Sequence, residues 1–187
     1  MIVATGNPGK LAELRELLDG QGLELVAWTE EVEESGASYA ENAILKAEAA
    51  ARATGSPALG DDSGLEVAAL GGAPGLHSKR VGATQAERNQ ALWQRLAGVP
   101  RPWPATFVAV LALAVPGRPP RLFVGRAEGE VLPAAPGEGG FGYDPVFLVP
   151  ELGLTFAQLG RSEKHRLSHR GRAAAALVES GVLSSIE

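Results

Sequence analysis

LGDDSGLEVAALGGAPGLHSKR, residues 59–80, is the stretch around which we expect this chain to be organised. It places two adjacent carboxylates, Asp61 and Asp62, between the short apolar run 57–59 and a Ser-Gly turn. An acidic pair at the end of a strand is a natural seat for Mg²⁺, which takes one or two carboxylates and completes its shell with water and substrate phosphates. The same residues also fit an ordinary Asp-Ser-Gly turn, and spacing alone leaves both interpretations open.

Length and composition limit the class of protein. The chain has 187 residues, 45% of them hydrophobic and 21% charged, which fits one globular domain or one domain in two lobes. Its formal net charge of −5 argues against DNA or RNA as the main partner, because binding to a phosphate backbone usually requires a basic surplus. The absence of cysteine excludes disulfides and thiolate metal sites.

The hydropathy pattern indicates no membrane partner. No secretory signal pattern precedes the first expected strand, and the longest strongly apolar run, 105–115, is too short to span a bilayer. We therefore expect a cytoplasmic protein.

A strand, a Gly-rich turn and a helix start coincide at the beginning of the chain. The apolar strand 1–5 leads into the turn GNPGK, and the leucines of 11–18 share one helical face. Asn7 is expected to cap this helix and Pro8 to be its first residue. Lys10 then lies in the first turn, where the helix dipole disfavours a cation. An anion bound at the helix N-terminus would explain Lys10, and the alternative is a solvated surface lysine.

An Ala-rich helix is predicted shortly before the acidic pair. Ser38 and Glu41 fit a capping box at its start, and the helix contains Lys46. An acidic run precedes it, in which Glu33 or Glu34 could supply a further metal ligand, although such a run is more often a solvated face.

The second half of the chain is rich in hairpins. The Pro-rich segment 99–104 separates it from the first half, and the apolar strand 105–115 turns at 116–120 into a returning strand, 121–132. In the segment 137–145, four glycines surround two aromatic residues and one aspartate. Such a loop lets the backbone approach a flat ligand, stacks an aromatic ring on a base and offers an acceptor to a ring N–H. The alternative is a loop whose aromatic residues are anchored in the core.

Hydrogen-bond donors gather ahead of the Ala-rich terminal helix, in SEKHRLSHR, residues 162–170. Ser168 is the expected N-cap, which places His169 and Arg170 in the first turn, where cations are disfavoured unless an anion or acceptor is near. A cationic side chain in the first turn of a helix is therefore expected near both ends of the chain. A single polyanionic ligand contacted by both ends is the economical explanation.

Five blocks of the sequence resemble the signature blocks of the inosine triphosphate pyrophosphatase family, in the family's order. They are TGNPGK (5–10), ESGASYAENAILKA (34–47), DDSGLEVAALGGAPGLHSKR (61–80), GGFGYDPVF (139–147) and EKHRLSHR (163–170). Together they span nearly the whole chain.

This resemblance implies an α/β fold, an elongated two-lobed monomer around a central mixed, twisted sheet, with a nucleotide cleft between the lobes. We expect a single pyrophosphatase domain, 1–187, with lobes meeting near 99–104, and a homodimer. The implied activity is Mg²⁺-dependent hydrolysis of ITP, dITP and XTP to nucleoside monophosphate and pyrophosphate, which cleanses the nucleotide pool. The alternatives are a Maf-type nucleotide pyrophosphatase and a nucleotide-binding regulator that does not catalyse hydrolysis.

The resemblance also implies roles for individual residues. Asp62 matches the family's general base, which is also a metal ligand. Glu34 matches the other metal-associated carboxylate, and Glu33 is the alternative if the register differs by one residue. Lys46 matches a catalytic cation at the triphosphate. The remaining substrate contacts are expected from Thr5, Gly6, Asn7, Pro8, Gly9, Lys10 and Ser63 at the triphosphate, and from Phe141, Gly142, Tyr143, Asp144, Lys164, His169 and Arg170 around the base.

Base selection follows from hydrogen-bonding capacity. Hypoxanthine and xanthine carry O6 and N1–H, whereas adenine carries an amino group and an unprotonated N1. A pocket that donates to O6 and accepts from N1–H would reject adenine by about 1–3 kcal/mol for each buried group left unpaired. Guanine shares O6 and N1–H, so its exclusion must depend on the 2-amino group.

Overall fold

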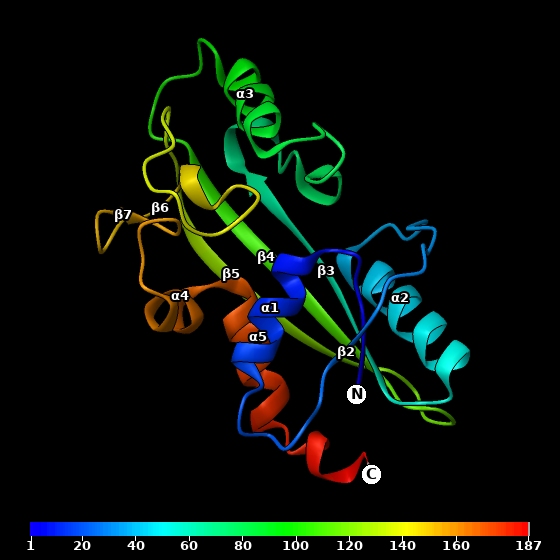
Figure 1. Ribbon diagram of the computed structural model, residues 1–187. Coiled ribbons are helices and arrows are strands. Elements are labelled where there is room, and N and C mark those ends of the chain that lie inside the picture. Colours follow the sequence, from blue (N-terminus) through cyan, green and yellow to red (C-terminus); the bar gives the residue numbers. More distant parts are fainter. Residues whose placement is uncertain (187) are drawn as a thin grey trace. The chain divides into compact units, whose positions relative to one another are not determined.

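The computed structural model describes residues 1–186 of the chain, and these residues contain one mixed sheet of seven strands (Figure 1). The strands hydrogen-bond in the order β2-β1-β3-β4-β5-β6-β7. Their bounds are β1 Ile2–Ala4, β2 Val26–Trp28, β3 Ala58–Val67, β4 Pro104–Ala114, β5 Arg121–Val131, β6 Phe147–Val149 and β7 Leu154–Thr155. Strand β1 pairs in parallel with β2 and β3, and β6 pairs antiparallel with β5 and β7. The predicted α/β class with a mixed sheet is confirmed.

Five α-helices accompany these strands within the described residues. They are α1 Pro8–Leu17, α2 Tyr39–Thr54, α3 Gln85–Leu96, α4 Arg161–Leu167 and α5 His169–Glu179. The predicted N-caps of α1 and α2 are confirmed, because the Asn7 side chain caps α1, whose first residue is Pro8, and the Ser38 side chain caps α2. Helix α4 was not expected from the sequence. No helix within residues 1–186 is both long enough and apolar enough to cross a membrane.

Strand β3 differs from the prediction. The sequence suggested a short strand, a Ser-Gly turn and a second strand, whereas Ala58–Val67 forms one continuous strand. Asp61 and Asp62 therefore lie inside a strand and are both buried. Because successive side chains of a strand point to opposite faces, the two carboxylates cannot form one two-carboxylate seat for a cation.

The chain divides into two compact units. The first comprises Met1–Asp62, Ala109–Gly125 and the segment that begins at His169, and the second comprises Ser63–Val108 and Arg126–Ser168. The chain passes from one unit to the other within β3, β4 and β5, because these strands are long enough to contribute to both. The Pro-rich segment 99–104, where we expected the lobes to meet, lies inside the second unit.

Two apolar clusters build the first unit, one on each face of its strands. Helices α1 and α5 contribute to the first cluster, which includes Val3, Leu14, Leu59, Leu111 and Leu177. Helix α2 contributes to the second, which includes Ala4, Ala43, Ala47, Ala58 and Ala112. Neighbours along a strand belong to opposite clusters, as the alternation of strand side chains requires.

Two glycines allow helices to lie directly against the strands of the first unit. A Cβ atom on Gly60 would meet the backbone of Ala43 and lie 2.8 Å from the backbone nitrogen of Ala47, both in α2. A Cβ atom on Gly125 would meet the carbonyl oxygen of His169 and lie 2.5 Å from the backbone nitrogen of Ala173 in α5. The start of α5 can therefore pack directly on β5 only because residue 125 is a glycine.

An aromatic cluster forms the core of the second unit. The ring of Phe147 lies 4.7 Å from that of Phe107 and 4.8 Å from that of Phe156, measured between centroids. Tyr143 is buried in the same cluster, and its hydroxyl donates to the carbonyl oxygen of Ser78 at 3.3 Å. Burial raises the pKa of Tyr143 to about 12, although nearby arginines oppose the change. This side chain thus matches the core-anchor interpretation of its loop.

We expect Gly125→Ala to lower the free energy of unfolding by about 1–3 kcal/mol, because the added methyl group forces α5 away from β5. Urea unfolding at neutral pH measures this change. Gly160→Ala is the control, because no atom lies within 4 Å of a Cβ built there, and its cost should stay below about 1 kcal/mol. Equal costs for the two variants would contradict the packing argument.

Candidate active site

The turn between β1 and α1 is closed by its own side chains. The Asn7 N–H donates to Thr5 Oγ1 at 3.1 Å, and Asn7 Oδ1 accepts from the N–H groups of Gly9 at 2.9 Å and Lys10 at 3.3 Å. These are the helix N–H groups that the sequence led us to expect for an anion. A phosphate at this turn must therefore compete with Asn7 for them.

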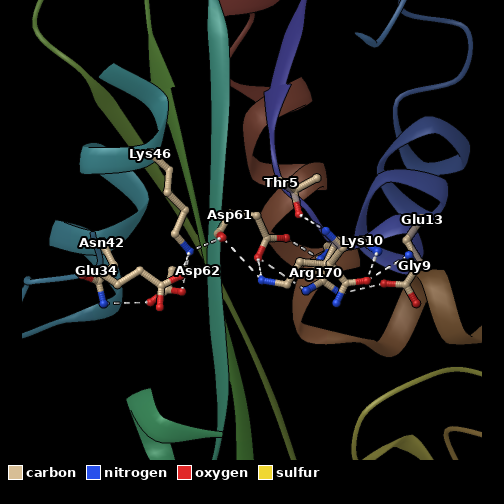
Figure 2. A network of polar contacts seen from close by, with 11 residues as sticks. Thr5, Gly9, Lys10, Glu13, Glu34, Asn42, Lys46, Asp61, Asp62 and Arg170 are labelled. Atoms are coloured by element: carbon tan, nitrogen blue, oxygen red, sulfur yellow. Dashed lines mark hydrogen bonds and ion pairs between the residues drawn. The ribbon is translucent and has the colours of Figure 1, made fainter. Parts of the chain in front are cut away.

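Residues from both ends of the chain meet at the carboxylate of Asp61 (Figure 2). Lys10 Nζ donates to Asp61 Oδ1 at 2.7 Å, and Arg170 Nε donates to Asp61 Oδ2 at 2.5 Å. Arg170 Nη1 also donates to Glu13 Oε2 in α1 at 2.7 Å. Lys10 and Arg170, which lie near opposite ends of the chain, therefore contact the same carboxylate. The anion that balances them is a side chain of the protein, so the misplaced cations alone no longer require a polyanionic ligand.

The charged groups of this cluster are buried, and burial and pairing shift their pKa values. Arg170 and Asp61 are each only 1% exposed. Burial by itself would raise the pKa of Asp61, but the charges and hydrogen bonds of Arg170 and Lys10 outweigh it and hold that pKa well below its usual range. Burial is also the largest influence on Lys10 and lowers its pKa, against the opposing effect of Asp61. A nucleotide could reach the Arg170 guanidinium only if neighbouring groups moved.

Asp62 points to the other side of β3, toward α2 (Figure 2). The ammonium group of Lys46 lies 2.8 Å from Asp62 Oδ1, 2.9 Å from Glu34 Oε1 and 3.0 Å from the carbonyl oxygen of Asp61. The amide of Asn42 donates from Nδ2 to Asp62 Oδ2 at 3.3 Å. Burial by itself would lower the pKa of Lys46. The charges and hydrogen bonds of Asp62 and Glu34 outweigh burial and raise this pKa above its usual value, so Lys46 is held in its charged form.

Glu34 and Asp62 form a donor set that fits Mg²⁺. Both carboxylates contact the same ammonium group, so they already converge on one positively charged point. Glu33 is exposed, which favours Glu34 of the two register alternatives. No group of three or more His, Cys, Asp or Glu within residues 1–186 is arranged to hold a metal ion. A site of two carboxylates agrees with the habit of Mg²⁺ to take its other ligands from water and phosphate.

A second polar cluster forms within the second unit, from residues expected around the base. Lys164 Nζ donates to Asp144 Oδ2 at 2.8 Å, and the N–H of Phe141 donates to the same oxygen at 2.8 Å. The Lys164 ammonium also lies 5.2 Å from the centre of the Phe141 ring. Gly140 has a φ of +72°, and a side chain there would collide with Asp144. This loop therefore requires glycine where it passes the carboxylate.

The remaining expected site residues fall into both units. Ser63 follows Asp62 in β3 and belongs to the second unit, as does Gly142, which has a φ of +65°. His169 is buried at the start of α5 in the first unit. The structure thus brings together Lys10 with Arg170, Glu34 with Lys46 and Asp62, and Phe141 with Asp144 and Lys164.

Glu13 and Asn42 were not singled out from the sequence, and Asp61 was expected only as half of an acidic pair. Glu13 lies three positions after Lys10 on α1, and this spacing on one helical face is a signal that could have found it. The separate role of Asp61 would have followed from strand alternation, had the acidic pair been placed inside a strand. Asn42 follows a capping glutamate in α2, and nothing in the local sequence indicates its contact with Asp62.

We expect Asp61→Asn to lower the free energy of unfolding by about 3 kcal/mol at pH 7, because it leaves buried cations without their carboxylate. The pKa of Asp61 is depressed in the folded state, so its stabilisation is present above about pH 4 and declines as the pH falls toward the folded-state pKa. The difference from the unsubstituted protein should therefore narrow at pH 3. Urea unfolding at both pH values tests this, with the exposed Asp19→Asn as control. A difference that widens in acid would refute the assignment.

The sequence profile of the Ham1 family matches residues 1–180. The chain is 52% identical to a protein named dITP/XTP pyrophosphatase in Thermus thermophilus, over 96% of this chain and 90% of that protein. It is 53% identical to another of that name in Gloeobacter violaceus, over 92% and 89%. The solved structure of a HAM1 protein from Coxiella burnetii matches this chain with a TM-score of 0.85 and 42% identity, over 98% of both chains. The structure of the Staphylococcus aureus Ham1 protein matches with a TM-score of 0.85 and 34% identity, also over 98% of both chains. With the family profile and such relatives covering nearly its whole length, this chain belongs to the Ham1 family.

Proposed function

We propose that this protein hydrolyses non-canonical purine nucleoside triphosphates, namely dITP, ITP and XTP, to nucleoside monophosphate and pyrophosphate. Such an activity removes damaged purines from the nucleotide pool. The observation that carries the proposal is the convergence of Glu34 and Asp62 on the ammonium group of Lys46. Relatives about 50% identical over most of the chain are named dITP/XTP pyrophosphatase, which supports dITP and XTP as substrates.

The first unit supplies the groups that such a reaction needs. Asp62 orients a water molecule and accepts its proton as the water attacks the α-phosphate. Lys46 and Lys10 contribute positive charge toward the triphosphate, whose own negative charge otherwise opposes attack. Mg²⁺ bound by Glu34 and Asp62 would lower the pKa of a bound water and neutralise phosphate charge.

We assign recognition of the base to the cluster of Phe141, Asp144 and Lys164. The Phe141 ring offers a face for stacking. Lys164 is a donor beside the Phe141 ring, which makes its ammonium group the candidate for donation to O6. The carboxylate of Asp144 is an acceptor, which makes it the candidate partner of N1–H. Adenine offers neither O6 nor N1–H, so this arrangement supports its exclusion.

We also propose that the protein works as a homodimer in the cytoplasm and binds neither nucleic acid nor a membrane. The exposed apolar side chains of Leu122 and Val124 on β5 are candidates for burial between subunits. The net charge of −5 is unfavourable for binding to a phosphate backbone.

Asp62→Asn should reduce the rate of hydrolysis of dITP about 10²–10⁴-fold, the range expected for loss of a general base, while nucleotide binding persists. The products of the unsubstituted protein, separated by ion-exchange chromatography, should be pyrophosphate and dIMP. Asp19→Asn serves as the control with full activity. Release of orthophosphate, or equal cleavage of ATP, would refute the proposed reaction, and a regulator that only binds nucleotide would show no hydrolysis to lose.

Lys164→Met should raise KM for XTP and ITP about tenfold and narrow their advantage over ATP, because it removes the proposed donor to O6 and the ion pair with Asp144. Steady-state kinetics with the three nucleotides measures both effects. Arg161→Met, an exposed cation at the start of the same helix, is the matched control. If the ratio of kcat/KM for ITP over ATP stays unchanged in Lys164→Met, base recognition lies elsewhere.

A further inference from the structure

Asn42 connects two parts of the site that the sequence does not connect. It lies near the start of α2 and is only 3% exposed. Its Nδ2 donates to Asp62 Oδ2 at 3.3 Å, and its Oδ1 accepts from the backbone N–H of Gly36 at 2.9 Å. Gly36 belongs to the loop that carries Glu34, two residues earlier. One side-chain amide therefore contacts both the general base and the loop of the second carboxylate.

The chemistry of this position suits an amide. A primary amide donates and accepts at the same time and carries no charge. The N–H of Gly36 requires an acceptor, which fixes the Asn42 oxygen on that side and directs the amide nitrogen toward Asp62. An aspartate in this position would still accept from Gly36, but it would present a second carboxylate to Asp62.

The loop lies tightly against α2 at this point. A Cβ atom on Gly36 would lie 2.6 Å from the Cβ of Glu41 and 2.7 Å from Asn42 Oδ1. The Glu41 carboxylate also accepts from the N–H of Ala37 at 2.5 Å, which holds the next residue of the loop. Contact with Asn42 thus depends on the absence of a side chain at Gly36.

The two oxygens of Asp62 are held by different groups. Lys46 contacts Oδ1 at 2.8 Å and Asn42 contacts Oδ2. The carboxylate cannot rotate without losing both contacts, so the oxygen that receives a proton keeps its direction. A base held in its productive orientation contributes more to rate than one that must first be oriented.

We infer that Asn42 is a positioning residue that sets the orientation of Asp62 and the location of Glu34 through the Gly36 contact. The inference deepens the proposed pyrophosphatase function and rests on it. It assigns two separable effects, one on the chemical step through Asp62 and one on the metal requirement through the loop.

Asn42→Asp and Gly36→Ala separate these effects. Asn42→Asp keeps the acceptor for Gly36 and removes the donor to Asp62, so kcat for dITP at saturating Mg²⁺ should fall about 10- to 100-fold with KM nearly unchanged. Gly36→Ala keeps the donor to Asp62 and displaces the loop, so the Mg²⁺ concentration that gives half-maximal rate should rise about tenfold while kcat at saturation stays within about threefold.

A measurement on the metal-free protein reports the contact without catalysis. Amide hydrogen exchange at Gly36, followed by NMR, should accelerate at least tenfold in Asn42→Ala, which removes the acceptor, and stay near that of the unsubstituted protein in Asn42→Asp. Asn89→Ala is the matched control, because Asn89 is a buried asparagine near the start of α3 in the second unit, and neither the kinetics nor the exchange at Gly36 should change.

Two failures are distinguishable. If the unsubstituted protein releases no pyrophosphate from dITP or XTP, the proposed function and this inference fall together. If it is active but Asn42→Asp retains its kcat, or Gly36→Ala retains its Mg²⁺ requirement, the positioning role alone is refuted. Asn42→Asp has nearly the same shape as the native side chain, so it decides the question even if Asn42→Ala does not fold.

Discussion

The ion pairs of one buried carboxylate hold the first unit together. Asp61 accepts from Lys10 in α1 and from Arg170 in α5. Arg170 also forms an ion pair with Glu13 in α1. A buried charge is strongly unfavourable unless it is paired, so these helix ends are constrained to meet at β3. The pairing also places a lysine and an arginine in the first turns of their helices, where the helix dipole opposes them and the carboxylate compensates.

Strand alternation then gives the neighbouring carboxylate a different task. Asp61 and Asp62 are adjacent in sequence, yet β3 directs them to opposite faces. The first is fully engaged in holding α1 and α5, which leaves Asp62 to face Asn42, Lys46 and Glu34 on the α2 side. The acidic pair is therefore one structural anchor and one candidate catalytic group, not a shared cation site.

Local signals in the sequence were sufficient for the starts and caps of α1 and α2, and insufficient for contacts across the fold. Asn7 and Pro8 fix the start of α1 through neighbouring atoms, so their roles could be predicted. The continuity of β3 through its Ser-Gly pair depends on pairing with other strands, and Asn42 acquires its role only when β3 lies beside α2. The family resemblance led us to expect Lys10, Lys46 and Asp62 at the site. The side chains that they contact could not be predicted from the spacing of residues in the sequence.

Lys46 explains how Glu34 and Asp62, the two carboxylates that we propose for Mg²⁺, stay close together without a metal ion. Glu34 and Asp62 would repel each other if brought together alone, and the loop of Glu34 would be free to move away. An ammonium group contacting both at 2.9 and 2.8 Å offsets that repulsion and keeps the carboxylates close. Because Mg²⁺ sheds its water reluctantly and is often bound together with phosphate, such a site needs no permanent ion to stay formed. The three donors of this ammonium group point to the two carboxylates and to the carbonyl oxygen of Asp61, so its position between Glu34 and Asp62 is fixed.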